Sequence, residues 1–375
     1  MALPAVAKIA AKSAVHLVRE STLHNLLSHF PKKCNYAFAY GSAVFAQQGQ
    51  KQGGKMLDLI FVVDSPVEWH EENMALNSSH YSALRYFGPR LIAKVQESMA
   101  SGVYYNPFVT LDGQLIKYGV ISTSALERDL TKWNQIYIAG RLHKPVLELQ
   151  PPSSASLMRA LNFNRESALR TVLLQEGRYL SKYTLFHGIT ELSYLGDSRM
   201  KLGENPDKAR NIVIPMMGEF EAVYAPLIHG LKPMVEVNAD GLIVQNTTPQ
   251  ERFKHLMALP IQVQINLCRQ LFRDPRLCDI EEVMAELSYM PTLRNFIRNS
   301  ITDVVWGSSI LQTVQGLLSA GIVRSVKYAW EKLQKGREGR QMQQERMKRS
   351  SQHQIDNHND EDQYHQHFRS QQRKT

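Results

Sequence analysis

The stretch "FAYGSAVFAQQGQKQGGKMLDLIFVVD", residues 38–64, contains two apolar runs separated by a polar, glycine-rich interval. The first run ends at Tyr40 and is followed directly by Gly41-Ser42, whereas the second carries a carboxylate, Asp58, in its interior. Short apolar runs bounded by turn residues favour strands. Residues 35–40 and 56–63 are therefore predicted to be strands, and the central question is why one of them carries a charge. A plain hairpin with a buried, capped aspartate is one possible answer.

Strands and helices are mixed on both sides of this stretch, through about residue 150, which favours an α/β or α+β fold. Asp112-Gly113 lies between two apolar runs and predicts a hairpin over 103–122, with Pro107 at an edge or a bulge. Helices are expected at 21–30, capped by Ser21 or Thr22 and closed by Pro31, at 64–77, at 80–99 with a break at Gly88-Pro89, and near 122–133.

The second half of the chain has mainly helical patterns. "LQPPSSAS", residues 149–156, is the best linker candidate, and beyond it only residues 241–246 are expected to form a strand. Residues 331–375 are rich in Gln, His, Arg and Asp and poor in apolar side chains, so a disordered tail is predicted.

Composition limits the possible functions. The chain has 375 residues, is 43% hydrophobic and carries a net charge of +9, of which residues 1–33 hold +4 and residues 331–375 hold +3. The body between them is nearly neutral, which argues against a large nucleic-acid surface, since such a surface needs a basic stripe on the folded domain. Cys34, Cys268 and Cys278 are too few and too scattered for a disulfide framework or a zinc site.

The N-terminal segment is typical of a mitochondrial targeting helix. Its first acidic residue is Glu20, and Lys8, Lys12, His16 and Arg19 recur at helical spacing on one face. An ordinary surface helix is the alternative. Residues 1–20 are therefore predicted to direct the chain to mitochondria.

A strand, a Gly-Ser turn and a second strand with a carboxylate resemble the active site of the nucleotidyltransferase superfamily, which has a polymerase-β-like fold. In that superfamily the Gly-Ser backbone approaches the nucleotide's phosphates, because glycine permits close approach and exposed N–H groups bind phosphate oxygens. The resemblance implies that Gly41 and Ser42 bind the phosphates and that Asp58 is a Mg²⁺ ligand.

A longer resemblance covers roughly residues 25–325. The segments "AYGSAVF", "LDLIFVVDSPVEWH", "SHYSALRYFGP", "GVYYNPFV", "LIKYGVIS", "IYIAGRLHKPV", "ELSYLGDSRM" and "SSILQTVQGLLSAGI" follow in this order. They resemble the mitochondrial CDP-diacylglycerol synthases, the translocator assembly and maintenance proteins. The resemblance implies a Mg²⁺-dependent phosphatidate cytidylyltransferase that joins CTP to phosphatidic acid, releases pyrophosphate and feeds cardiolipin synthesis from the matrix side of the inner membrane.

The resemblance also implies an organisation into parts within an α+β fold. A polymerase-β-like nucleotidyltransferase domain is expected at 21–150 and a mainly helical, winged-helix-like domain at 151–300. A C-terminal amphipathic helix is expected at 301–330.

The metal site departs from the superfamily pattern, because many relatives carry a second acid two residues after the first. Here Asp58 is followed by Leu59-Ile60, and Asp64, six residues further on, is about 20 Å away along a straight strand. Asp58 is thus the one expected carboxylate ligand, and Asn106 is a weak candidate for the second.

Lys117 is expected to bind the triphosphate or the lipid phosphate, unless it is an ordinary edge-strand lysine. The phosphate monoester of phosphatidic acid has a second pKa near 6 and is largely an oxyanion at neutral pH. The reaction then needs cations to bring two anions together more than it needs a base. His70, His80 and Tyr81 could be phosphate contacts or structural residues.

The lipid substrate requires contact with a membrane. Residues 304–323 carry no charge, yet they are too polar for a membrane span. A helix from about Ser309 has an apolar stripe followed by basic residues, which is typical of an interfacial helix on anionic lipid. A helix packed on the protein's own core is the alternative. The expected membrane contacts are Leu317, Leu318, Ile322, Arg324 and Lys327.

Two other function classes remain open at this point. One is a nucleotidyltransferase acting on RNA or another acceptor, and the other is a non-enzymatic import or assembly factor. The oligomeric state is not predicted. An intact Gly41-Ser42 and Asp58 favour an enzyme.

Overall fold

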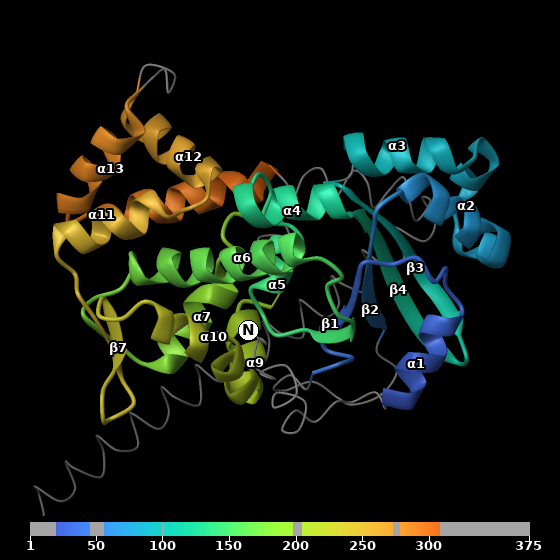
Figure 1. Cartoon of the computed structure of the whole chain (residues 1–375), viewed down its shortest axis with the longest axis horizontal. Coiled ribbons are helices and arrows are strands. Elements are labelled where there is room, and N and C mark those ends of the chain that lie inside the picture. Colours follow the sequence, from blue (N-terminus) through green and yellow to red (C-terminus); the bar gives the residue numbers. More distant parts are fainter. Residues whose placement is uncertain (1–19, 46–55, 100, 198–204, 273–277, 308–375) are drawn as a thin grey trace, which may run out of the picture.

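The computed structural model describes residues 20–45, 56–99, 101–197, 205–272 and 278–307. Within these ranges the chain has an α+β fold, with a five-stranded sheet at one end and a mainly helical part at the other (Figure 1). The targeting segment at 1–20, apart from Glu20, and the tail at 331–375 lie outside the described residues.

The sheet has the strand order β3-β4-β2-β1-β5, so β4, β2 and β1 are internal. β2 runs parallel to β4, whereas β1 pairs antiparallel with both β2 and β5, and β3 pairs antiparallel with β4. The strands are β1 (Tyr36–Tyr40), β2 (Leu57–Val63), β3 (Val103–Leu111), β4 (Gln114–Ser122) and β5 (Leu147–Gln150).

Helices flank this sheet and begin where the sequence offers caps. α2 starts with Pro66 and is capped by Ser65, whose hydroxyl accepts from the Glu68 N–H, and Ser122 caps α4 in the same way. The elements are α1 (Glu20–Ser28), α2 (Pro66–Asn77), the 3₁₀ turns η3 (Ser78–His80) and η4 (Ala83–Phe87), α3 (Pro89–Met99), α4 (Thr123–Lys132) and α5 (Ala139–Leu142).

The second part contains helices and a small antiparallel sheet of order β6-β8-β7. A further helix, without a label, spans residues 293–307. The elements are α6 (Ala155–Leu173), β6 (Tyr179–Leu180), α7 (Lys182–Glu191), α9 (Lys208–Val213), η5 (Ile214–Met216), α10 (Met217–Gly230), β7 (Val235–Val237), β8 (Ile243–Gln245), α11 (Pro249–Met257), α12 (Ile261–Leu271) and α13 (Ile280–Tyr289).

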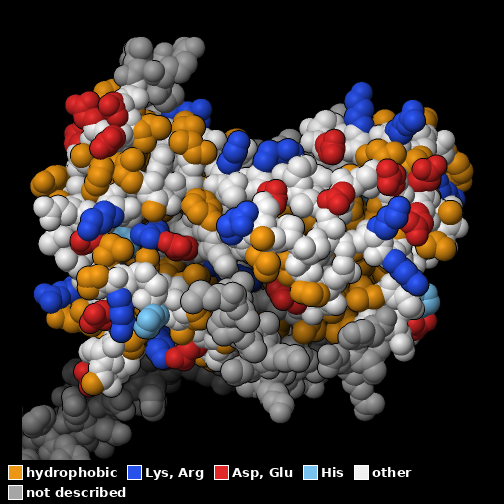
Figure 2. All heavy atoms as spheres, viewed as in Figure 1, with side chains coloured by type: hydrophobic (Ala, Val, Ile, Leu, Met, Phe, Trp, Pro, Cys, Tyr) orange, Lys and Arg blue, Asp and Glu red, His pale blue; other side chains and the backbone are white. Residues whose placement is uncertain are grey.

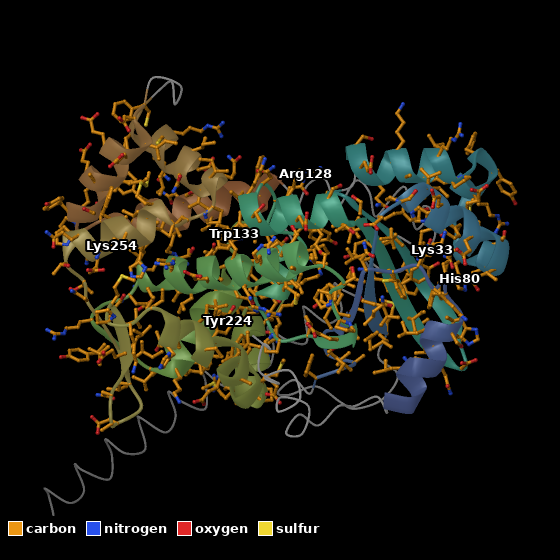
Figure 3. All side chains as sticks on the ribbon, in the orientation of Figure 1. Lys33, His80, Arg128, Trp133, Tyr224 and Lys254 are labelled. Carbon is orange, nitrogen blue, oxygen red and sulfur yellow. The ribbon has the colours of Figure 1, made fainter. Side chains whose placement is uncertain are left out.

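One continuous apolar core joins the two parts. It includes Phe38 of β1, Leu169 of α6 and Leu267 of α12. Trp133 lies between α4 and α6, and its indole N–H donates to Asn164 Oδ1 at 2.8 Å (Figure 3). The helical part is therefore packed directly on the part that carries the sheet, which allows both to contribute to one site.

Most predicted elements are confirmed, with four corrections. Ser21 and Thr22 lie inside α1 and do not cap it, because the helix already includes Glu20. Residues 83–87 form a 3₁₀ turn, and Leu149 and Gln150 of the expected linker belong to β5. β6 and β7 were not expected, since strands of two or three residues show no recognisable alternation.

The hairpin prediction is confirmed in detail. Asp112-Gly113 joins β3 to β4, and both residues have positive φ, as a type I′ turn requires. Pro107 lies on an edge strand at a register shift between Asn106 and Val109. The three cysteines are free thiols. Across the described part of the chain, no helix is long and apolar enough to cross a membrane.

Candidate active site

Asp58 and Lys117 lie side by side on two neighbouring internal strands of the five-stranded sheet, near the start of β2. The parallel pairing of β2 with β4 puts Asp58 opposite Lys117, and the antiparallel pairing with β1 puts Tyr40 on the other side of Asp58. Lys117 Nζ is 4.0 Å from Asp58 Oδ1, and the two side chains are 18% and 26% exposed. Since β4 is internal, Lys117 is not an edge-strand lysine.

The Gly41-Ser42 turn reaches the same carboxylate. Gly41 has φ +86°, and its carbonyl accepts from the N–H groups of Val44 and Phe45 at 3.1 and 3.0 Å. A Cβ at position 41 would be 3.4 Å from Asp58 Oδ2. A side chain here would thus be strained and would touch the carboxylate, so glycine is needed where the turn passes Asp58. Ser42, the next residue, is half-buried.

Aromatic rings hold the cations around this turn. Lys117 Nζ lies 4.2 Å from the ring centroid of Tyr105, and Arg141 Cζ lies 4.1 Å from that of Tyr137 and 5.3 Å from that of Tyr40. Burial raises the pKa of Tyr40, while the nearby charge of Arg141 acts to lower it and that of Asp58 to raise it. Arg141 and Asp58 therefore lie close to the same tyrosine.

Arg141 was not predicted as a site residue, although it lies in the quoted segment "IYIAGRLHKPV". Two cations within four residues, Arg141 and Lys144, were the signal that could have found it. The approach of Arg141 to Tyr40, the neighbour of Asp58 in the sheet, depends on tertiary packing, which the spacing of the residues does not reveal.

Buried polar groups position the segment that carries Arg141. Asp129 Oδ2 accepts from the N–H groups of Ile138 and Ala139, both at 2.9 Å, and burial raises the pKa of Asp129 although these N–H groups act to lower it. Asn164 Nδ2 donates to the Ala139 carbonyl, and the Tyr224 hydroxyl donates to the His143 carbonyl at 2.6 Å. Figure 3 shows Tyr224 in the centre of the molecule, away from the outer end of the sheet.

Asn106 is not brought to Asp58. It is opposite Tyr118 in the register of β3 and β4, and Tyr118 is the neighbour of Lys117 on β4. Since successive side chains on a strand face opposite sides, Asn106 and Lys117 lie on opposite faces of the sheet. The geometry therefore gives no support to Asn106 as the second metal ligand.

His70, His80 and Tyr81 lie in a buried network on that opposite face. His70 Nδ1 is 2.9 Å from the Tyr81 hydroxyl, and His80 Nδ1 is 3.1 Å from the Tyr118 hydroxyl. Asn73 Nδ2 donates to both of these hydroxyls. These three residues are therefore structural residues and not phosphate contacts, because their side chains form hydrogen bonds with other buried side chains.

Asp64 also forms hydrogen bonds with neighbouring side chains of the fold. Its Oδ1 accepts from the amide of Asn35 and from the Thr123 hydroxyl. It lies beyond the end of β2 that is remote from Asp58, in agreement with the expectation that the two do not share a metal. Among the described residues, no group of three or more His, Cys, Asp or Glu side chains could hold a metal ion.

The expected membrane contacts lie outside the described residues. The described residues stop at 307, within a helix, and Leu317, Leu318, Ile322, Arg324 and Lys327 all lie beyond it. Their role stays a prediction. In the described first part of the expected 301–330 helix, Ile301, Val304 and Val305 are buried in the protein's own core.

The fold and the site define a mixed α+β protein with a glycine turn, a carboxylate and cations gathered at one sheet end. The family described as mitochondrial phosphatidate cytidylyltransferase matches residues 23–335. Proteins with this name from Mus musculus, Xenopus laevis and Caenorhabditis elegans are 41%, 40% and 36% identical to the chain. These matches cover 84%, 83% and 83% of this chain and 94%, 93% and 97% of the relatives. The chain belongs to this family.

Proposed function

We propose that the chain is a phosphatidate cytidylyltransferase of mitochondria, which converts CTP and phosphatidic acid to CDP-diacylglycerol and pyrophosphate. The family supports the reaction, and the relatives it matches are named as mitochondrial. The observation that carries the proposal is the meeting of Gly41, Asp58 and Lys117 in one place. We further propose that residues 21–150 are a polymerase-β-like nucleotidyltransferase domain and residues 151–300 a winged-helix-like domain.

In this proposal the triphosphate of CTP lies over the Gly41-Ser42 turn. The backbone and the Ser42 hydroxyl donate to phosphate oxygens, and glycine lets the phosphates approach the backbone. Lys117 and Arg141 neutralise the charge that builds up on the phosphates as pyrophosphate leaves. Tyr105 and Tyr137, whose rings lie against these cations, fix where the charges point.

Asp58 is the proposed Mg²⁺ ligand. Magnesium is commonly bound by one or two carboxylates, with water and substrate phosphates completing the octahedron, so a single accessible carboxylate beside a phosphate turn fits this ion. When bound, the ion would neutralise the triphosphate and polarise its phosphorus–oxygen bonds. Lys117, 4.0 Å from Asp58, would hold the carboxylate in place.

The acceptor needs no general base in this reaction. One oxygen of the phosphate monoester forms a bond to the α-phosphorus of CTP, and the bond from that phosphorus to the bridging oxygen of pyrophosphate breaks. The attacking oxygen is already largely deprotonated at neutral pH. The main obstacle is repulsion between two anions, and the residues at the site are of the kind that removes it, cations and N–H donors.

We also propose that the protein is peripheral on the matrix side of the inner membrane and docks through the part of the expected 301–330 helix that follows residue 307, since Ile301, Val304 and Val305 are buried in the core. The sequence of this segment, apolar on one stripe with Arg324 and Lys327 after it, supports the proposal.

The proposal is tested by incubating the purified full chain with labelled CTP, Mg²⁺ and either phosphatidic-acid liposomes or RNA. Label in CDP-diacylglycerol, with release of pyrophosphate and dependence on Mg²⁺, is the expected result. Label transferred to RNA would favour a different acceptor, and no transfer to either would favour a non-enzymatic role.

A further inference from the structure

A second group of cations lies beyond Arg141 and is not used by the site at Asp58. Lys144 Nζ and Lys208 Nζ lie 5.1 and 4.9 Å from the centroid of the same ring, that of Tyr194. Both side chains are half-buried. The ammonium groups of two lysines thus lie against the one ring of Tyr194, and this arrangement concentrates positive charge in one place.

Three separate segments build this group. Lys144 follows α5, Tyr194 follows α7, and Lys208 is the first residue of α9, which packs beside α7 (Figure 1). Lys144 Nζ donates to the Gly140 carbonyl and, at 2.8 Å, to Ser193 Oγ. A Cβ at Gly140 would come within 2.6 Å of Ser193 Cβ, so glycine is what lets α5 touch this segment. The ammonium of Lys144 is held by its surroundings rather than extended into solvent.

The cations are close enough to act on one another. The pKa of Lys144 is held well below its usual value, by burial first and then by the charges of Arg141 and Lys208. Bringing like charges together out of water destabilises the protein, and a bound anion would reverse that cost. An anion with two negative charges, such as a phosphate monoester, would interact favourably with all three cations.

Arg141 connects the two groups of cations. On one side its guanidinium lies against Tyr40, which is next to Asp58 in the sheet, and on the other it influences Lys144. A row of cations therefore leads from Lys117 through Arg141 to Lys144 and Lys208. A transferase that joins two anionic substrates needs positive charge near both of them. The Gly41-Ser42 turn and Asp58 are assigned to CTP, which leaves the phosphate of the second substrate without a binding group.

We propose that Lys144 and Lys208, held around Tyr194, form an acceptor subsite that binds the phosphate monoester of the lipid substrate. This inference rests on the proposed function, since it names where the second substrate of that reaction binds. The triphosphate end of CTP has the same phosphate chemistry and is the competing occupant. The subsite draws Lys208, Ser193 and Tyr194 from the helical part, which thereby contributes to binding as well as to stability.

The test compares Lys208→Gln with Lys254→Gln in the full chain. Lys254 is a matched control, because it is an exposed lysine of α11 paired with Glu251, at the end of the molecule opposite the sheet (Figure 3). KM is measured separately for CTP and for a short-chain, water-soluble phosphatidic acid. We expect Lys208→Gln to raise KM for the lipid roughly tenfold, as the loss of one charge-assisted contact predicts, with little change in KM for CTP. Lys208→Arg, which keeps the charge, should recover most of the affinity.

The opposite pattern would overturn the proposal. A rise in KM for CTP without a rise for the lipid would assign the cations to the nucleotide, and no change in either KM would remove them from the site.

A second measurement does not depend on activity. Glycerol 3-phosphate, a soluble phosphate monoester, should raise the thermal unfolding midpoint of the wild type and of Lys254→Gln, and should raise that of Lys208→Gln much less. If no cytidylyl transfer were found but this difference held, the subsite would stand and the proposed function would fail. An equal shift in all three proteins, or no shift in any, would overturn the subsite itself.

Discussion

The two faces of the five-stranded sheet use polar residues in opposite ways. Lys117 and Tyr118 are neighbours on β4, yet Lys117 faces Asp58 and Tyr105, whereas Tyr118 faces Asn73 and His80. We call the side of Lys117 the site face and the side of Tyr118 the network face. Figure 2 shows acidic and basic side chains interspersed over one side of the molecule, so charge alone does not distinguish a site.

The difference lies in burial and in the partners of the polar atoms. On the network face the groups are neutral and buried and bond to one another, and burial lowers the pKa of His70 to about 4, although its bond to Gln96 acts to raise it. On the site face the groups are charged and partly exposed. A polar residue in a strand is therefore a candidate for catalysis only where its side chain is charged and exposed enough to contact a ligand.

The largest expected effect is that of Asp58→Asn. Loss of the charge that would hold the metal against the triphosphate should lower kcat about 1000-fold, or about 4 kcal/mol, without unfolding the protein. Initial rates over a range of Mg²⁺ concentrations, with circular dichroism as the check on folding, measure this. Asp64→Asn, just beyond the opposite end of the same strand, is the matched control, and it should affect stability more than rate. Near-normal turnover of Asp58→Asn at low Mg²⁺ would show that Asp58 is not the ligand.

Lys117→Gln should have the next largest effect. Removing one preorganised cation from the transition state typically costs about 100-fold in kcat, or about 2.7 kcal/mol. The thermal midpoint should change little. Lys117 and Asp58 are both partly exposed, so the change does not leave a fully buried carboxylate behind. A fall in stability with a normal rate would move Lys117 from the site to the scaffold.

The network face should respond to acid instead. The folded-state pKa of His70 is about 4 and the unfolded value is about 6.5. The unfolded chain therefore binds a proton first, and the stability that His70 provides above pH 6.5 is lost as the pH falls toward 4. Between pH 7.5 and 5.0 the loss due to His70 should be about 2 kcal/mol. Urea unfolding at the two pH values measures it.

His70→Gln is the variant for this prediction, since glutamine does not titrate. Its stability should depend less on pH than that of the wild type, whereas Lys117→Gln should keep the wild-type dependence. Equal acid sensitivity in His70→Gln and wild type would mean that another group is responsible.

The smallest effect is expected for Tyr118→Phe, which removes the hydroxyl that Asn73 and His80 contact. A buried hydrogen bond contributes about 1 kcal/mol, so the unfolding free energy should fall by about that amount while kcat per folded molecule stays the same. The side chain next to Lys117 would then change stability alone. A loss of rate comparable to that of Lys117→Gln would show that the two faces are coupled.

Local sequence determined much of the sheet and the first half of the site. Apolar runs and the Asp112-Gly113 turn specify β1–β4, because strand and hairpin signals act over a few residues. Gly41 and Asp58 were predicted together because a strand, a Gly-Ser turn and a second strand with a carboxylate resemble a nucleotidyltransferase active site. The antiparallel pairing of β1 with β2 brings the end of one to the start of the next. Lys117 was named from its segment, but its position beside Asp58 comes from the parallel pairing of β2 with β4.

Only the tertiary structure decided the rest. Asn106 was expected near Asp58, but the register of β3 against β4 turns it to the network face, and a register cannot be read from one strand alone. Arg141, Lys144 and Lys208 form one row because α5, α7 and α9 pack together, although the residues are spread along the chain. Sequence patterns record which residues can face a core, and the meeting of charges from distant segments depends on how those cores pack.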